Sequence, residues 1–159
     1  MKLRAFTLIE TLLYLALFNV IFFAVMTWAI ALSQNNRDAE YKNAVEKNAI
    51  LVSEHINDSF QKGLSVDSAN SIFDSASSKV RILFDTGYFE YQSNGGVLTV
   101  TNETTTFALT DKFVNVTNFT VAPVIVQPNT IVGARITVTF VAEKFPTETK
   151  TIQSYYAFR

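Results

Sequence analysis

The pattern of apolar and polar residues changes once along the chain, near residue 36. Residues 11–36 contain no charged side chain, and residues 11–32 are apolar except for Thr11, Tyr14, Asn19 and Thr27. As a helix with a rise of about 1.5 Å per residue, these 22 residues extend over about 33 Å, enough to cross the hydrocarbon core of a bilayer. The pattern therefore predicts a membrane-spanning helix.

Beyond residue 36 charges return, and apolar residues recur every three or four positions up to residue 60. This spacing places them on one stripe of a helix, formed by Tyr41, Val45, Ala49, Val52, Ile56 and Phe60. Gly63 follows, close to the position at which glycine often ends a helix. We therefore expect one helix over residues 6–61, with a membrane-spanning first half and an amphipathic second half.

From residue 80 onward the chain is rich in β-branched and aromatic residues separated by turn signals, which is typical of strands. Asn94-Gly95-Gly96 predicts a hairpin turn between strands at 88–92 and 97–101, because Asn and Gly accept positive φ. The other predicted strands are 80–84, 105–109, 114–116 and 119–121 on either side of a bulge, 136–140 and 152–159. Residues 64–78 are predicted as a loop or short helix. The fold class is α+β, with the long helix packed against an antiparallel β-sheet head.

Composition narrows the range of functions. The chain has 13 Lys and Arg against 14 Asp and Glu, a net charge of −1, and no clustered basic face, which argues against a nucleic-acid partner. Without cysteine it has no disulfide, thiol nucleophile or Cys-based zinc site. His55, the single histidine, has no Ser or Cys motif beside it, so we expect a structural role. We expect no enzymatic activity, cofactor or metal ligand.

Two basic residues, Lys2 and Arg4, precede the apolar run. By the positive-inside tendency they keep the N-terminus in the cytoplasm and place the rest of the chain outside it. A secretory signal peptide has a shorter apolar core and a small-residue cleavage site, which residues 33–37 do not match. A plain single-pass anchor in the cytoplasmic membrane fits the hydropathy equally well.

Glu10 is the feature that a plain anchor does not require. A carboxylate at the edge of an apolar helix is costly in lipid and usually marks a function. No Lys or Arg follows it within one helical turn, so its partner must come from elsewhere. The simpler alternative is that Glu10 extends to the membrane interface.

These N-terminal residues resemble those of type IV prepilins and type II secretion pseudopilins. The shared pattern is a short basic leader, the small residue Ala5, then Phe6-Thr7-Leu8-Ile9-Glu10 and a long apolar run. The resemblance implies that prepilin peptidase cuts between Ala5 and Phe6 and that the new Phe6 amine is methylated. It also implies that Glu10 pairs with the Phe6 amine of a neighbouring subunit. The family usually has Gly before the cut, where this chain has Ala5.

The resemblance implies three parts and a set of partners. The parts are a leader (1–5), a long helix (6–61) whose residues 6–32 lie in the membrane or filament core, and a C-terminal head (62–159). The partners are other pilin subunits, prepilin peptidase, the inner-membrane assembly platform and, before assembly, membrane lipid. The precursor is placed in the cytoplasmic (inner) membrane with its C-terminus outside the cytoplasm, and the processed chain in a pilus or pseudopilus.

Two features favour a minor rather than a main subunit. Residues 6–32 lack the Gly and Pro that interrupt this helix in many main subunits. The closing residues, with Tyr155, Tyr156 and Phe158 ahead of Arg159, resemble the last strand of minor pilins. The alternative is a membrane-anchored extracytoplasmic binding or adhesin-like domain that never polymerises. The two hypotheses differ in whether the mature chain begins at Phe6 or Met1.

Overall fold

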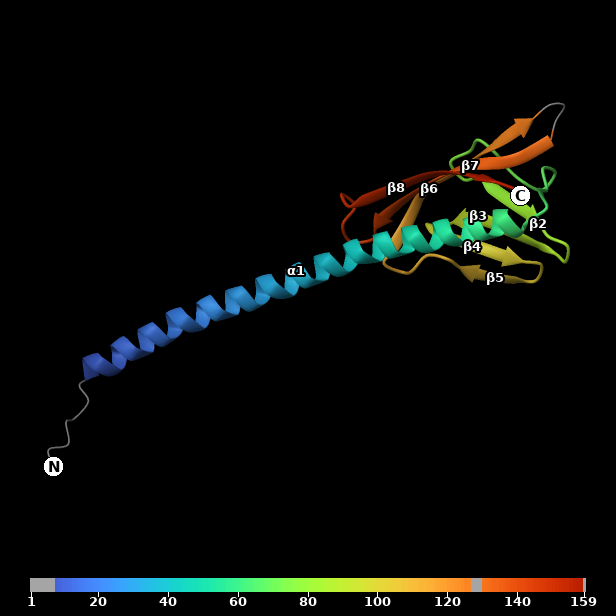
Figure 1. Ribbon diagram of the computed structural model, residues 1–159. Coiled ribbons are helices and arrows are strands. Elements are labelled where there is room, and N and C mark those ends of the chain that lie inside the picture. Colours follow the sequence, from blue (N-terminus) through green and yellow to red (C-terminus); the bar gives the residue numbers. More distant parts are fainter. Residues whose placement is uncertain (1–7, 127–129, 159) are drawn as a thin grey trace. The chain divides into compact units, whose positions relative to one another are not determined.

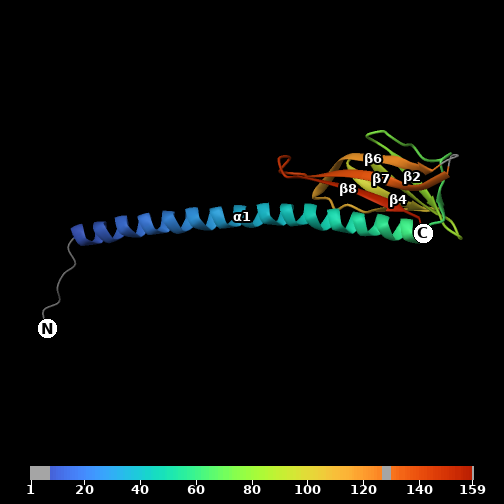
Figure 2. The ribbon, with the colours of Figure 1, turned by 45° about the horizontal axis from the view of Figure 1, so that its top comes forward.

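The computed structural model describes residues 8–126 and 130–158. Its first element is a helix of 55 residues, α1 (Leu8–Lys62), shown in Figures 1 and 2. The chain divides into two compact units, Met1–Ala39 and Glu40–Arg159, and α1 contributes residues to both. The prediction of one long helix over 6–61 is confirmed from residue 8 onward, whereas residues 6 and 7 lie outside the described part of the chain.

The amphipathic stripe predicted for the second half of α1 is confirmed. All six of its members are buried, together with the polar residues Asn48 and Ser59. The Asn48 side chain is fully used: Nδ2 donates to the carbonyl of Ala44 (2.7 Å), and Oδ1 accepts from the amide of Asp111 (2.8 Å). A buried amide bonded at both ends costs little and here ties the helix to the backbone at Asp111.

Glycine is required at position 63, just after the helix, because a side chain would not fit there and not because the backbone has a positive φ. Its φ lies outside the left-handed region. A Cβ at this position would lie 2.5 Å from Cγ2 of Ile82 and 2.7 Å from the carbonyl oxygen of Ser59. Only glycine lets the end of α1 approach the Ile82 side chain this closely.

The head contains two antiparallel sheets. The sequence predicted the strands but not how they divide between sheets. One has the order β1-β2-β3-β4-β5 and the other β6-β7-β8 (Figures 1 and 2). The first sheet comprises β1 (Ser65–Val66), β2 (Lys79–Leu83), β3 (Tyr88–Asn94), β4 (Val97–Asn102) and β5 (Thr105–Ala108). The second comprises β6 (Val114–Val126), β7 (Thr130–Ala142) and β8 (Thr149–Ala157).

The predicted turn and bulge are both present. Asn94 pairs with Val97 across a two-residue turn in which Gly95 and Gly96 have φ of 58° and 83°. Two successive positive φ angles are the mark of the hairpin turn that matches strand twist. In β6 the pairing register shifts between Val116 and Asn118, so the two strands predicted at 114–116 and 119–121 are one strand with a bulge between them.

The short helix considered for residues 64–78 is wrong. This segment forms β1 and an isolated bridge between Ile72 and Lys79. Its serine hydroxyls compete with helical hydrogen bonds by binding backbone groups. The hydroxyl of Ser71 donates to the Asp67 carbonyl (2.7 Å) and accepts from the Arg81 amide (3.0 Å). The segment is therefore held to the sheet through its side chains.

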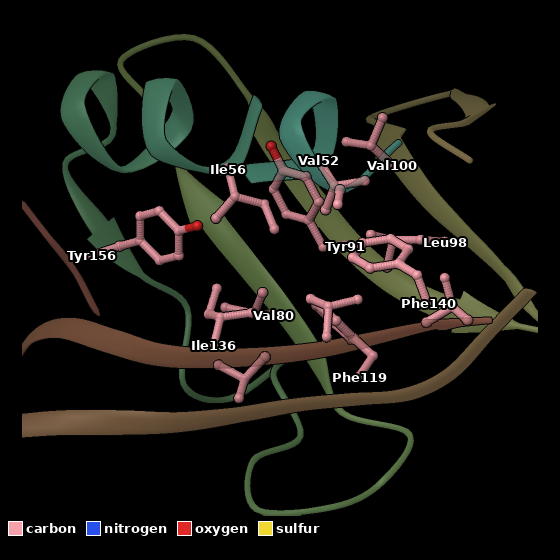
Figure 3. Packing of buried hydrophobic residues seen from close by; sticks show 14 of the residues in the cluster. Val52, Ile56, Val80, Tyr91, Leu98, Val100, Phe119, Ile136, Phe140 and Tyr156 are labelled. Carbon is pink, nitrogen blue, oxygen red and sulfur yellow. The ribbon is translucent and has the colours of Figure 1, made fainter. Parts of the chain in front are cut away.

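The core lies where α1 and both sheets meet. Figure 3 shows side chains from all three sources gathered in one cluster: Val52 and Ile56 from α1, Val80, Tyr91, Leu98 and Val100 from the first sheet, and Phe119, Ile136, Phe140 and Tyr156 from the second. In β7 alternate residues are buried, including the predicted Ile136, Val138 and Phe140. Tyr156 stacks on Phe60 with ring centroids 5.5 Å apart, which binds the closing strand to the helix.

A fragment of residues 37–159 should fold by itself, because every buried residue of the core falls within it. We expect it to be soluble and monomeric, with a circular dichroism spectrum of mixed helix and sheet and a cooperative urea transition. A fragment that aggregates or unfolds without a transition would show that the head depends on the apolar half of the chain.

Candidate functional site

The apolar half of α1 is the most unusual surface of the molecule. Residues 8–37 are all exposed, although most of them are apolar. By length and composition it is the one described helix that could cross a membrane. A soluble protein rarely exposes a contiguous apolar surface of this extent, so this segment requires lipid or protein around it.

The hydroxyls of the two threonines in this segment are bonded within the helix itself. Thr11 Oγ1 donates to the Leu8 carbonyl and Thr27 Oγ1 to the Phe23 carbonyl, each at 2.8 Å. Two of the phenylalanines, Phe18 and Phe22, stack with centroids 6.2 Å apart. The helix therefore presents an apolar surface despite its threonines.

Glu10 lies in the first turn of α1 and is exposed. Residues 8–126 and 130–158 provide its carboxylate with no ion pair or hydrogen bond. The position is favourable for a negative charge because the amino end of a helix carries the positive end of the macrodipole. The other predicted processing residues, Ala5 and Phe6, lie outside the described residues.

A second group of polar residues lies at the carboxyl end of α1, where its side chains meet strand β3. The hydroxyl of Tyr91 is 2.7 Å from Nδ1 of His55 and 2.5 Å from Oγ of Ser59. Tyr91 is fully buried, and the His55 ring is half-buried and packs edge-on against it with centroids 5.7 Å apart. His55 thus has the structural contacts of a packed side chain. Nothing in the sequence indicated that the hydroxyl of Tyr91, 36 residues after His55, would contact its ring.

Burial controls the charge of this group. It lowers the pKa of His55 below its usual 6.5, an effect that the nearby carboxylate of Asp58 partly opposes. Burial also raises the pKa of Tyr91 far above its usual value, although the hydrogen bond from Ser59 acts in the other direction. His55 and Tyr91 are therefore both neutral near pH 7.

On the first sheet, Arg81 and Glu90 form a cross-strand ion pair between β2 and β3. Nη2 of Arg81 lies 2.6 Å from Oε2 of Glu90, and Lys79 Nζ lies 3.4 Å from the same oxygen. The hydrogen bond to Glu90 raises the pKa of Arg81 further. The Arg81 guanidinium also covers the Tyr88 ring at 4.2 Å. These contacts stabilise the pairing of the two strands.

Within the described ranges no three His, Asp or Glu side chains are grouped so as to hold a metal ion. Comparison of the chain with models of protein families, with curated proteins and with solved structures found no match. The arguments for function therefore rest on two features of this chain: the apolar half of α1 with Glu10, and the polar group around His55.

The lowered pKa of His55 predicts how the stability of the head depends on pH. Below pH 6.5 the unfolded chain binds a proton that the folded chain resists, so the free energy of unfolding should fall as the pH falls towards the pKa in the folded state. The loss should stay below about 1 kcal/mol because water screens a half-exposed ring. Urea unfolding between pH 7 and pH 5 measures it.

The matched variants are His55→Gln, which should flatten this part of the curve, and Asp58→Asn, which should steepen it by removing the charge that favours protonated His55. Equal slopes for the parent protein and His55→Gln would contradict the assignment.

Proposed function

We propose that this chain is a structural subunit of a type IV pilus or pseudopilus, processed by prepilin peptidase and assembled through its N-terminal helix. The observation that carries the proposal is an exposed apolar helix half that has a single carboxylate, Glu10, in its first described turn. A membrane anchor needs the apolar surface but not the carboxylate. Assembly gives both a use, because neighbouring subunits cover the apolar surface and one of them supplies a cation for Glu10.

The energetics of Glu10 support this assignment. A carboxylate in a low-dielectric surrounding is tolerated when an ammonium group lies beside it, and removing one partner of a buried pair costs about 3–5 kcal/mol. The amine of Phe6, freed by cleavage after Ala5, is the partner that we assign in a neighbouring subunit. Before assembly the same helix lies in the cytoplasmic membrane with the head outside the cytoplasm.

The design of α1 also supports a filament role. One helix of 55 residues joins an apolar segment to a second half that is packed under two sheets, without an intervening linker. Because one continuous helix connects the two parts, a subunit that is held in a filament by its apolar half stays attached to its folded head. We further propose that the chain is a minor pilin, present at low copy number, because no Gly or Pro interrupts the apolar half.

The processing prediction is tested on filaments sheared from cells and analysed by intact-mass measurement. The chain should begin at Phe6, carry one added methyl group, and be scarce beside a main subunit. Finding uncut chain that begins at Met1, in cells with active prepilin peptidase, would favour the anchored binding domain. Finding the processed chain as the dominant subunit would contradict only its minor rank.

The assembly role of Glu10 is tested by Glu10→Leu. This change makes the helix more apolar, so membrane insertion should be retained. Incorporation into filaments should fall at least tenfold, since about 1.4 kcal/mol already corresponds to a factor of ten and the lost pair is worth more. Quantitative immunoblots of membranes and of sheared filaments provide both measurements.

The matched control is Thr11→Leu, the adjacent position, which raises hydrophobicity without removing the carboxylate. It should enter filaments as the parent does. If Glu10→Leu and Thr11→Leu are incorporated equally, the pairing role of Glu10 is wrong.

A further inference from the structure

An open cleft of about 480 Å³ lies between the last turns of α1 and the first sheet. We call it the His55 cleft. Its walls come from α1, from the turn between β2 and β3, and from strands β3 and β4. His55, Asp58, Ser59 and Lys62 lie on the helix, Phe84 and Thr86 in the turn, and Tyr88, Phe89 and Asn102 on the strands. Its volume is within the range of sites that hold small organic ligands.

One wall of the cleft is aromatic. Phe84 and Phe89 pack edge to face with centroids 5.0 Å apart, and the His55 ring lies 6.0 Å from that of Phe89. Both phenylalanines are only partly buried. Partly exposed rings of this kind offer a surface on which an apolar ligand face can stack.

The polar contacts behind the cleft determine which nitrogen of His55 a ligand would meet. A phenol is a stronger proton donor than a neutral imidazole, so we assign the Tyr91 hydroxyl as the donor in its 2.7 Å contact with Nδ1, with the Ser59 hydroxyl donating to Tyr91. The proton of neutral His55 is then on Nε2. With Nδ1 engaged, Nε2–H is the ring donor left for a ligand.

The charges of the cleft cancel. Its one ammonium, Lys62, pairs with its one carboxylate, Asp58, at 2.7 Å, and neutral His55 adds none. A cleft that has no net charge does not select an anion or a cation. Its remaining groups, an imidazole N–H, the Asn102 amide and the Thr86 hydroxyl, have the donors and acceptors that match the hydroxyls of an uncharged ligand.

From this combination we propose that the His55 cleft binds a neutral pyranose sugar. The apolar face of the ring stacks on the Phe84–Phe89 wall, and its hydroxyls accept from Nε2 of His55 and bond with Asn102 and Thr86. The site lies wholly within the unit Glu40–Arg159, so it applies equally to a filament subunit and to an anchored domain. It does not depend on the proposed function.

The test uses the full-length chain in detergent micelles and nuclear magnetic resonance of the imidazole ring. His55 is the only histidine, so its ring signals are unambiguous. The probes are the methyl glycosides of glucose, galactose and mannose, and N-acetylglucosamine. At least one should shift the His55 signals saturably, with a dissociation constant in the millimolar range.

Asn102→Ala should weaken the binding at least tenfold. The control is Asn43→Ala, an exposed asparagine of α1 outside the cleft, which should bind as the parent does. Three results would overturn the proposal: no saturable shift with any sugar up to tens of millimolar, unchanged binding by Asn102→Ala, or a response to N-acetylphenylalanine amide alone. The last would make the cleft a site for peptide side chains.

Discussion

The rest of the structure depends on the burial of one stripe of α1 beneath two sheets. Each fully buried Val, Ile or Phe side chain contributes about 1.5–3 kcal/mol, and Val52, Ile56 and Phe60 are each 1% exposed. The core takes residues from the five-stranded sheet, the three-stranded sheet and the helix, so the inner faces of both sheets are covered by the same stripe. The close approach at Gly63 and the stack of Tyr156 on Phe60 follow from that arrangement. The helix is thus the central element of the head.

The same helix meets opposite demands at its two ends. In residues 41–60 the stripe side chains are buried and most of the others are exposed to solvent, so this half needs a folded partner on one side only. Residues 11–32 are apolar on all sides and need cover all round, which water cannot provide. A carboxylate at the start of such a segment adds a cost that the helix macrodipole reduces only in part and that no ion pair among the described residues offsets. The proposed filament role follows because assembly both covers the apolar surface and brings a cation to Glu10.

Much of the fold could be predicted because it is encoded locally. The stripe from Tyr41 to Phe60, the Asn94-Gly95-Gly96 turn and the alternation of Ile136, Val138 and Phe140 each arise within a few neighbouring residues. What could not be predicted depends on which segments pair and which do not. The division into two sheets arises because β5 and β6, which follow one another in the chain, do not pair. In residues 64–78 the Ser71 hydroxyl bonds to the Arg81 amide, a contact that holds the segment to the sheet. At the candidate site, Glu10 could be identified from the sequence because it is a charged residue at the start of an apolar run. The contact of the Tyr91 hydroxyl with His55 could not be predicted, because a tyrosine on a predicted strand does not indicate which helix residue it will contact.

The two candidate sites share no residue and belong to different compact units. Assembly chemistry depends on the charge of Glu10 and the apolar surface that follows it. Recognition chemistry depends on the neutral polar and aromatic side chains around His55, which are held in place by the buried Tyr91 and Ser59. A change in the cleft therefore leaves the surface that neighbouring subunits would cover untouched, and a change at Glu10 leaves the hydrogen bonds of His55 intact. This separation would let the ligand specificity of the head vary while the apolar half of α1 retains the one surface that assembly requires.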